Sequence, residues 1–289
     1  MRALRLSMCN VTSTFRSSSV FFVNNKSSTF TASYCLIGDE ILNGKTRDSN
    51  AYYLSKYLFD LGIDLKKVEI VPDDYSAIAE SVKKLSTEHD IVFTSGGIGP
   101  THDDITYSAL AKAYNLSLKL DQETCEKMLK MSRTKFPDWT LTEARKRMAL
   151  FPEPCGILRK NEAYWVPVVV VNKNIHVLPG IPRLFEGLLD SLKPHLKQLV
   201  QEKGSSGHYH RVQVATKLPE GEIADFLSQL QDQVNQHDIK IGSYPNWGQD
   251  ENDTRVVVSV VGKDQSLVQS IGQEVVNATQ GWIDNTIKD

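Results

Sequence analysis

A short stretch at residues 93–106, FTSGGIGPTHDDIT, combines three glycines with two adjacent aspartates. Gly96, Gly97 and Gly99 have no Cβ, so the backbone there can take positive φ angles and approach a ligand closely. Consecutive N–H groups ahead of a helix form a site for a phosphate or another oxyanion, and the Thr101 hydroxyl would add a donor. The stretch therefore predicts a phosphate-binding loop; the alternative is a tight turn that binds nothing.

Asp103 and Asp104 follow this loop directly. Acidic residues favour the first turn of a helix through its dipole, but one of them would be enough for that purpose. Two carboxylates beside a phosphate would repel it unless a hard divalent cation lies between them. We therefore interpret the backbone as the phosphate holder, and Asp103 and Asp104 as metal ligands and candidate catalytic residues.

Acidic residues also follow the other predicted strands. Residues 38–50, GDEILNGKTRDSN, place Asp39 and Glu40 after an apolar run, and residues 73–74 are both aspartate at the end of the next strand. Each acid alone has a structural alternative as a helix cap, and Asp48 is a good N-cap. Three acidic strand ends in one sheet favour a shared cation site, with Asp39 and Glu40 as further metal ligands.

The elements that position these residues alternate between strand and helix. Short apolar runs predict strands, and apolar residues at helical spacing predict helices. The expected strands cover residues 33–37, 64–72 and 90–95, and the expected helices cover residues 48–62, 74–89 and 103–116. This alternation indicates a layered α/β sheet, in which ligands bind beyond the carboxyl ends of the strands.

The rest of the chain divides at a glycine-rich linker, residues 201–208. Before the linker we expect two helices in residues 122–152 broken near Pro137, a strand pair in residues 165–182 that turns at 172–174, and one helix over 183–200. After it we expect strands at 210–216, near 239 and at 254–262, with helices at 220–233 and 265–279. The sequence thus predicts a domain over residues 34–203 and a small α+β domain over residues 208–289.

The overall composition excludes several classes of partner. The chain of 289 residues has a formal net charge of -2, with 40% hydrophobic and 24% charged residues. This balance gives no general attraction to nucleic acid or to an anionic membrane, and no apolar run approaches the roughly 18 residues of a membrane span. The four cysteines form no CxxC pair, so they indicate neither a disulfide framework nor a zinc site.

The first 33 residues differ from the rest of the chain. They contain basic and hydroxyl side chains but no acid, a pattern typical of a mitochondrial transit peptide. The alternatives are a disordered leader or a start codon placed too far upstream. The expected location is therefore mitochondrial or cytoplasmic.

The motifs GDEILNGKTRDSN, VPDD, SGGIGPTHDDIT and LPGIP follow the order and approximate spacing of the molybdopterin-binding fold. Residues 34–199 resemble the branch shared by the amino-terminal domains of competence/damage-inducible protein A and of eukaryotic FAD synthase. The segments LPEGEIADFL and IKIGSYPNW are similar to the small domain that follows in FAD synthases. The resemblance implies a three-layer α/β/α fold with a mostly parallel sheet, and a homo-oligomer.

In this branch the implied activity is hydrolysis of the pyrophosphate in FAD or ADP-ribose, giving AMP and a phosphate monoester. The implied cofactor is a divalent metal, Mg, Mn or Co. By motif, the resemblance assigns the substrate-binding residues Gly38, Asn50, Ser95, Gly96, Gly97, Gly99, Pro100, Thr101, Thr106, Pro179 and Gly180. It assigns the metal ligands Asp39, Glu40, Asp103 and Asp104, the last two being catalytic.

One segment departs from the family. Residues 159–170, RKNEAYWVPVVV, stand where the family has a Gly-Thr-Ala-Pro-Gly stretch that helps to close the pocket. There is also no SGGxDS-like loop, so we do not expect FAD synthesis. Two other functions stay open, namely adenylylation of molybdopterin and binding of a nucleotide or pterin without turnover.

Overall fold

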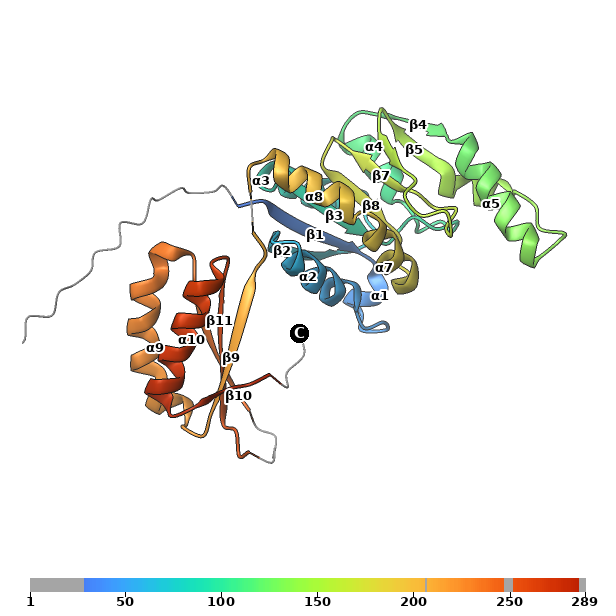
Figure 1. Cartoon of the computed structure of the whole chain (residues 1–289). Helices are drawn as coiled ribbons and strands as arrows, with labels where there is room; N and C mark the ends of the chain where they lie inside the picture. The colour runs from blue at the N-terminus through green and yellow to red at the C-terminus, as the bar shows by residue number, and fades with distance from the viewer. Residues whose placement is uncertain (1–28, 206, 247–251, 286–289) are drawn as a thin grey trace, which may run out of the picture.

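The computed structural model describes residues 29–205, 207–246 and 252–285, which form a large and a small domain (Figure 1). Most of the expected leader, residues 1–28, lies outside the described part of the chain. The predicted leader boundary at residue 33 is wrong, because the first strand, β1 (Thr31–Ile37), already begins at Thr31. The last residues assigned to the leader therefore belong to the sheet.

A six-stranded sheet forms the centre of the large domain, in the order β2-β1-β3-β8-β7-β6. β2, β1, β3 and β8 pair in parallel, whereas β7 is antiparallel to both of its neighbours. All residues of β3 (Ile91–Ser95) are buried, as expected for a strand with a neighbour on each side and helices over both faces. The other strands are β2 (Asp64–Val71), β6 (Gly156–Leu158), β7 (Val168–Val171) and β8 (Ile175–Leu178).

Helices cover both faces of this sheet, because successive side chains of a strand point to opposite faces. Tyr34 and Leu36 of β1 face one helical layer, and Cys35 and Ile37 face the other. The first layer contains α2 (Asn50–Asp60), α7 (Pro182–Ser191) and α8 (Lys193–Glu202). The second contains α3 (Tyr75–Glu88) and α4 (Thr106–Ala113). The predicted three-layer fold is confirmed.

The helix predictions differ from the structure in two places. Residues 183–200 form α7 and α8 rather than one helix, because Pro194 cannot continue a helical hydrogen-bond ladder and begins a new helix instead. The helix expected from residue 103 begins at Thr106. Asp103 and Asp104 therefore lie in the loop before α4, and the alternative that they belong to its first turn is wrong.

The region between α4 and β6 holds the two predicted helices and a strand pair that was not predicted. The helices, separated around Pro137, are α5 (Gln122–Lys135) and the short α6 (Glu143–Lys146). The strands β4 (Ser117–Leu120) and β5 (Leu150–Glu153) pair antiparallel. In Figure 1 this region lies at the end of the large domain farthest from the small domain.

The small domain has an antiparallel sheet in the order β10-β11-β9-β12. Figure 1 shows α9 and α10 beside each other against this sheet. Apolar side chains of both helices and of the sheet form one buried cluster. Its elements are β9 (His210–Thr216), α9 (Glu220–Val234), β10 (Lys240–Pro245), β11 (Val256–Gly262), α10 (Gln265–Thr279) and β12 (Trp282–Ile283). The predicted α+β unit is confirmed.

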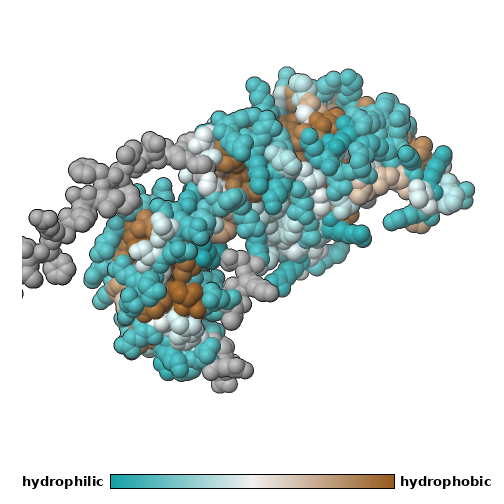
Figure 2. Space-filling model, viewed as in Figure 1, coloured by the Kyte–Doolittle hydropathy of each residue, from teal (hydrophilic) through white to brown (hydrophobic). Residues whose placement is uncertain are grey.

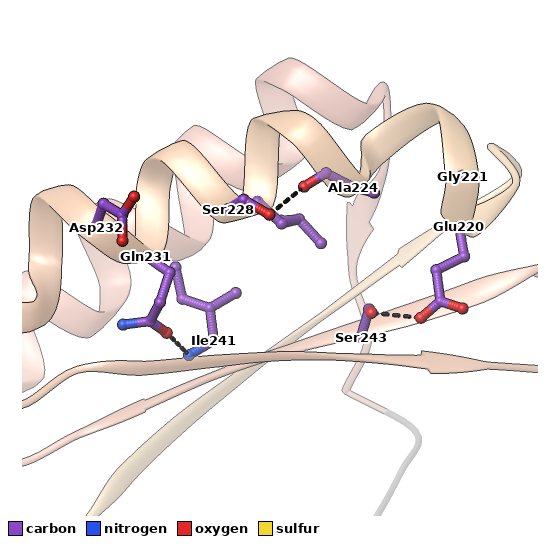
Figure 3. A pocket seen from close by; sticks show the side chains of 9 residues that line it. Glu220, Gly221, Ala224, Ser228, Gln231, Asp232, Ile241 and Ser243 are labelled. Atoms are coloured by element: carbon purple, nitrogen blue, oxygen red, sulfur yellow. Dashed lines mark hydrogen bonds between the residues drawn. The ribbon is translucent and has the colours of Figure 1, made fainter.

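The edge strand β10 is covered by a side chain of α9. Ile241 N–H donates to Gln231 Oε1 at 2.7 Å, and Gln231 Nε2 donates to the carbonyl oxygen of Ile239 at 2.9 Å. Figure 3 shows the first of these bonds among the residues that line a groove between α9 and β10. The side-chain amide of Gln231 thus satisfies two backbone groups at this edge that would otherwise be open to pairing with another strand.

The surface in Figure 2 is mainly hydrophilic, with separate apolar patches on both domains. Among the described residues, no helix has the length and apolar character that crossing a membrane requires.

Candidate functional site

Four neighbouring parallel strands bring the candidate residues to one edge of the sheet. β2, β1, β3 and β8 end beside one another, and their next loops carry Asp73, Gly38, Gly96 and Pro179 respectively. Strands that run in the same direction have their carboxyl ends at the same edge, so residues far apart in the sequence meet there. The two acidic turns that the sequence analysis singled out therefore face a common site.

The backbone of the loop after β3 requires glycine. Gly96 and Gly97 have φ angles of 97° and 62°, in the left-handed region. A Cβ at Gly96 would lie 2.0 Å from the carbonyl oxygen of Ile37, and one at Gly97 would lie 2.4 Å from Thr106 Oγ1. Thr106 in turn fixes the loop, since its hydroxyl donates to Gly96 O at 2.8 Å and its N–H donates to Gly97 O at 2.9 Å.

Three consecutive N–H groups of this loop lack an acceptor. Among the described residues, none accepts a hydrogen bond from the backbone N–H of Gly97, Ile98 or Gly99. These residues are half-buried and precede α4. Because adjacent backbone N–H groups of a turn attract anions, this segment is suited to a phosphate.

Asp104 stabilises the same loop through hydrogen bonds with Thr101. Its Oδ2 accepts hydrogen bonds from Thr101 N–H at 2.9 Å and from the Thr101 hydroxyl at 2.5 Å. A Cβ at Gly99 would lie 2.5 Å from that oxygen, so the carboxylate rests against the glycine. In this structure the Thr101 hydroxyl, expected to donate to phosphate, instead stabilises the turn.

Asp73 joins the acidic group, although the sequence analysis did not place it among the ligands. Its Oδ2 accepts a hydrogen bond from the N–H of Asp39 at 3.0 Å, at the start of the short helix α1 (Asp39–Leu42). Burial raises the pKa of Asp73, and the negative charges of Asp39, Glu40 and Asp103 raise it further, against the lowering effect of that hydrogen bond. Its place at the end of β2 was the signal that could have identified it.

The neighbouring aspartate, Asp74, has a different role. Its Oδ1 accepts hydrogen bonds from the N–H groups of Ser76 and Ala77, each at 2.9 Å, so it is the N-cap of α3. This confirms the capping alternative for that residue. Asp48 likewise accepts from the N–H of Asn50 at 2.9 Å and holds the first turn of α2.

The acidic group suits a cation that arrives with the substrate. Within the described ranges, no three His, Cys, Asp or Glu side chains converge as a resident metal cluster would. Mg²⁺ needs less than that, because it is held by one or two carboxylates, substrate phosphates and water. The negative charges of Asp39, Glu40 and Asp103 all raise the pKa of Asp73, so these carboxylates lie near one another. Their oxygens are the hard ligands that a divalent cation prefers. The donor chemistry therefore fits a divalent cation with few protein ligands.

A small cavity of about 60 Å³ opens between α1, the start of α2 and the loops after β3 and β8. Asn50 lies in its wall and is buried; its Nδ2 donates to Gly180 O at 2.9 Å, while its Oδ1 has no partner among the described residues. Tyr34 and Ser95 share a short hydrogen bond below, and burial raises the pKa of the Tyr34 hydroxyl. The cavity has room for a group about the size of a phosphate.

The segment that departs from the family packs against α7. Asn161 Nδ2 donates to the carbonyl oxygen of Gly187 at 3.1 Å, and the Tyr164 hydroxyl lies 2.5 Å from where a Cβ of Gly187 would be. None of residues 159–170 lines the small cavity. The departure therefore changes the packing of α7 and leaves the glycine loop intact.

Comparison with known proteins is consistent with this geometry. Residues 34–198 match the family described as Probable molybdopterin binding domain, and residues 208–285 match the family described as FAD synthase, middle domain. A protein of Archaeoglobus fulgidus is 33% identical over 233 residues, which cover 81% of this chain and 91% of that protein.

The chain is also 29% identical to the Probable FAD synthase of Caenorhabditis elegans, over 89% of this chain and 53% of that protein. It therefore spans about half the length of that relative. Among solved structures, the protein CinA of unknown function from Thermoplasma acidophilum is 29% identical with a TM-score of 0.51, over 58% of this chain and 98% of that one.

Proposed function

This chain belongs to the family of the probable molybdopterin binding domain, and from that premise we propose that it hydrolyses the pyrophosphate bond of a dinucleotide. The proposed substrates are FAD or ADP-ribose, and the products are AMP and a phosphate monoester. The FAD synthase relatives and the match of the small domain to an FAD synthase domain support a flavin or adenine nucleotide as the ligand.

The observation that carries the proposal is the set of N–H groups at Gly97, Ile98 and Gly99 without an acceptor among the described residues, close to the acidic group, since a Cβ at Gly97 would lie 3.3 Å from Asp73 Oδ1. A phosphate chain has oxyanions that need donors, and its charge needs a cation. One site that offers amides on one side and carboxylates on the other is suited to both.

The side chains have separate roles in this proposal. Asp39, Glu40, Asp73 and Asp103 would hold the divalent cation, Mg, Mn or Co. When bound, the cation neutralises charge on the diphosphate and lowers the pKa of a bound water. Asp104 keeps the loop in shape through Thr101.

The reaction needs only water as a second reactant. The oxygen of a water molecule attacks one phosphorus, the bond from that phosphorus to the bridging oxygen breaks, and the leaving phosphate takes the electron pair. The proton of the water passes to solvent. The amides of the glycine loop stabilise the charge that develops on the phosphoryl oxygens, because they are already oriented before the reaction.

The test is incubation of the full chain with FAD, ADP-ribose and NAD, each with magnesium, manganese or cobalt, followed by chromatography of the products. Asp103→Asn should lower turnover at least about a hundredfold, with an unchanged midpoint of unfolding. Asp138→Asn, at an exposed position on the α5–α6 connection, is the matched control and should keep full activity. Wild-type rates in Asp103→Asn would contradict the assignment.

A second candidate is nucleotide binding without turnover, which the departure of residues 159–170 from the family pattern favours. Calorimetric binding of ADP-ribose or FAD without product, with every metal tried, would support it. Release of pyrophosphate from ATP in the presence of molybdopterin would instead indicate adenylyl transfer.

A further inference from the structure

The two domains meet at a cleft of about 670 Å³ that shares no lining residue with the cavity at the strand ends. Residues of α2 and β2 form one wall, and residues of β9, β10 and β11 form the other. The lining is rich in aromatic rings and cations, including Tyr52, Lys56, Tyr209, Arg211, Lys240 and Tyr244.

One side of this interdomain cleft is fixed by contacts between the domains. The rings of Phe59 and Tyr209 stack with centroids 5.1 Å apart and planes 19° apart, and the Arg211 guanidinium lies 4.5 Å over the Phe59 ring. His208 Nδ1 donates to the carbonyl oxygen of Asp60 at 2.7 Å. These contacts join residues of both domains, so they hold the two walls of the cleft together along that side.

The other aromatic rings are exposed. Tyr52 of α2 is 68% exposed and Tyr244 of β10 is 61% exposed, which is high for such large rings. The Tyr244 ring lies over Gly242, where a Cβ would be 3.1 Å from the Tyr244 hydroxyl oxygen. Each domain therefore contributes one largely exposed aromatic ring to the lining of the cleft.

The charges at the cleft favour an anion. Lys56 Nζ lies 5.8 Å over the Tyr52 ring, and neither Lys56 nor Lys240 forms an ion pair with a described residue. Of the two acids in the lining, Asp64 is paired with Lys66, which leaves the Asp60 carboxylate. Two lysines without an ion pair to a described residue, Lys56 and Lys240, thus stand against one such acid, Asp60.

We propose that the interdomain cleft binds a planar aromatic phosphate of mononucleotide size. Its ring would contact Tyr244 and Tyr52, and its phosphate would be held by Lys56, Lys240 and Arg211. The volume lies in the range of small-molecule sites, and stacking on aromatic side chains suits any nucleobase or flavin ring. The products of the hydrolysis proposed above belong to this class, but the cleft site stands without that activity.

The test is titration of the full chain with FMN, AMP, riboflavin and adenosine in EDTA, by calorimetry and by quenching of flavin fluorescence. FMN should bind with quenched emission. Tyr244→Ala should weaken it about tenfold, and Tyr244→Phe should restore it. Lys240→Ala should weaken FMN and leave the weaker binding of riboflavin unchanged, because riboflavin has no phosphate.

Tyr75→Ala and Lys217→Ala, exposed positions outside the cleft, are the controls and should bind as wild type. The same titrations on the Asp103→Asn background should give the same affinities, so a failure of the proposed hydrolysis does not affect the result. Unchanged FMN affinity in the Tyr244→Ala/Lys240→Ala double variant would overturn the proposal. So would the absence of saturable binding of FMN and AMP, or binding only of a longer oligonucleotide.

Discussion

The side-chain amide of Asn50 donates a hydrogen bond to the carbonyl oxygen of Gly180 at 2.9 Å, across 130 positions of sequence. This bond joins the first turn of α2 to the loop after β8. Both ends of it line the small cavity beside the glycine loop. The cavity therefore depends on two segments that only the folded sheet brings together.

Asn50→Ala should weaken both the fold and the site. The substitution removes the donor to Gly180 and leaves the carbonyl oxygen unpaired, which costs about 1–2 kcal/mol of unfolding free energy. Urea unfolding of the variant measures this, and the KM for the dinucleotide should rise as well. Gln269→Ala removes an exposed side-chain amide of α10 and should change neither quantity. Equal stability of the two variants would show that the Asn50 contact contributes nothing.

Gly96→Ala should destabilise the chain far more than Gly44→Ala. Both glycines have positive φ, 97° and 76°, but only Gly96 also has a backbone oxygen, that of Ile37, 2.0 Å from the added Cβ. The open position should cost about 1–2 kcal/mol through its φ angle alone. The crowded position should cost more than about 3 kcal/mol, since strain and overlap add. Urea unfolding of both variants tests this, and similar losses would contradict it.

His176 should make stability depend on pH. Burial, together with the nearby His195, lowers its pKa to about 4 against the raising effect of its hydrogen bond to Asn174 O; the Nε2 atoms of the two histidines lie 3.3 Å apart. Below about pH 6.5 the unfolded chain binds a proton at this histidine, whereas the folded chain binds one only near pH 4. The free energy of unfolding is therefore at its full value above pH 6.5 and falls as the pH drops from 6.5 toward 4. The total loss is about 3 kcal/mol.

Urea unfolding at several pH values between 7.5 and 4.5 measures this dependence. His176→Gln has no group that titrates in this range, so its stability should fall less steeply with pH than that of the wild type. His102→Gln, at an exposed position, should keep the wild-type slope. An unchanged slope in His176→Gln would assign the pH dependence to other groups.

Gln231→Ala should uncover the edge of β10. The variant loses the bonds to Ile241 N–H and Ile239 O, which should cost about 1–3 kcal/mol. It also exposes an unpaired strand edge, which favours pairing with another chain. Sedimentation at increasing concentration should show more self-association than in Gln233→Ala, whose side chain is exposed on the same helix. Identical sedimentation of the two variants would argue against this protective role.

The local sequence pattern predicted most of the elements because their signals are local. β9 (His210–Thr216) and α10 (Gln265–Thr279) match their predicted bounds, since alternating and helical spacings of apolar residues end at polar or glycine positions. The strands β4 and β5 were missed because they are short and mostly exposed or proline-containing, so they carry little periodic signal. Their pairing depends on contacts across about 30 residues.

The sequence by itself determined the layered α/β fold, the glycine loop and the presence of acids after neighbouring strands, because residue type and spacing decide these features. Only the tertiary structure decided that Asp73 joins Asp39 and that Asn50 reaches Gly180. Which carboxylate faces the site depends on hydrogen bonds between loops of different strands. No spacing along the chain encodes those bonds, because the parallel order of the sheet sets them.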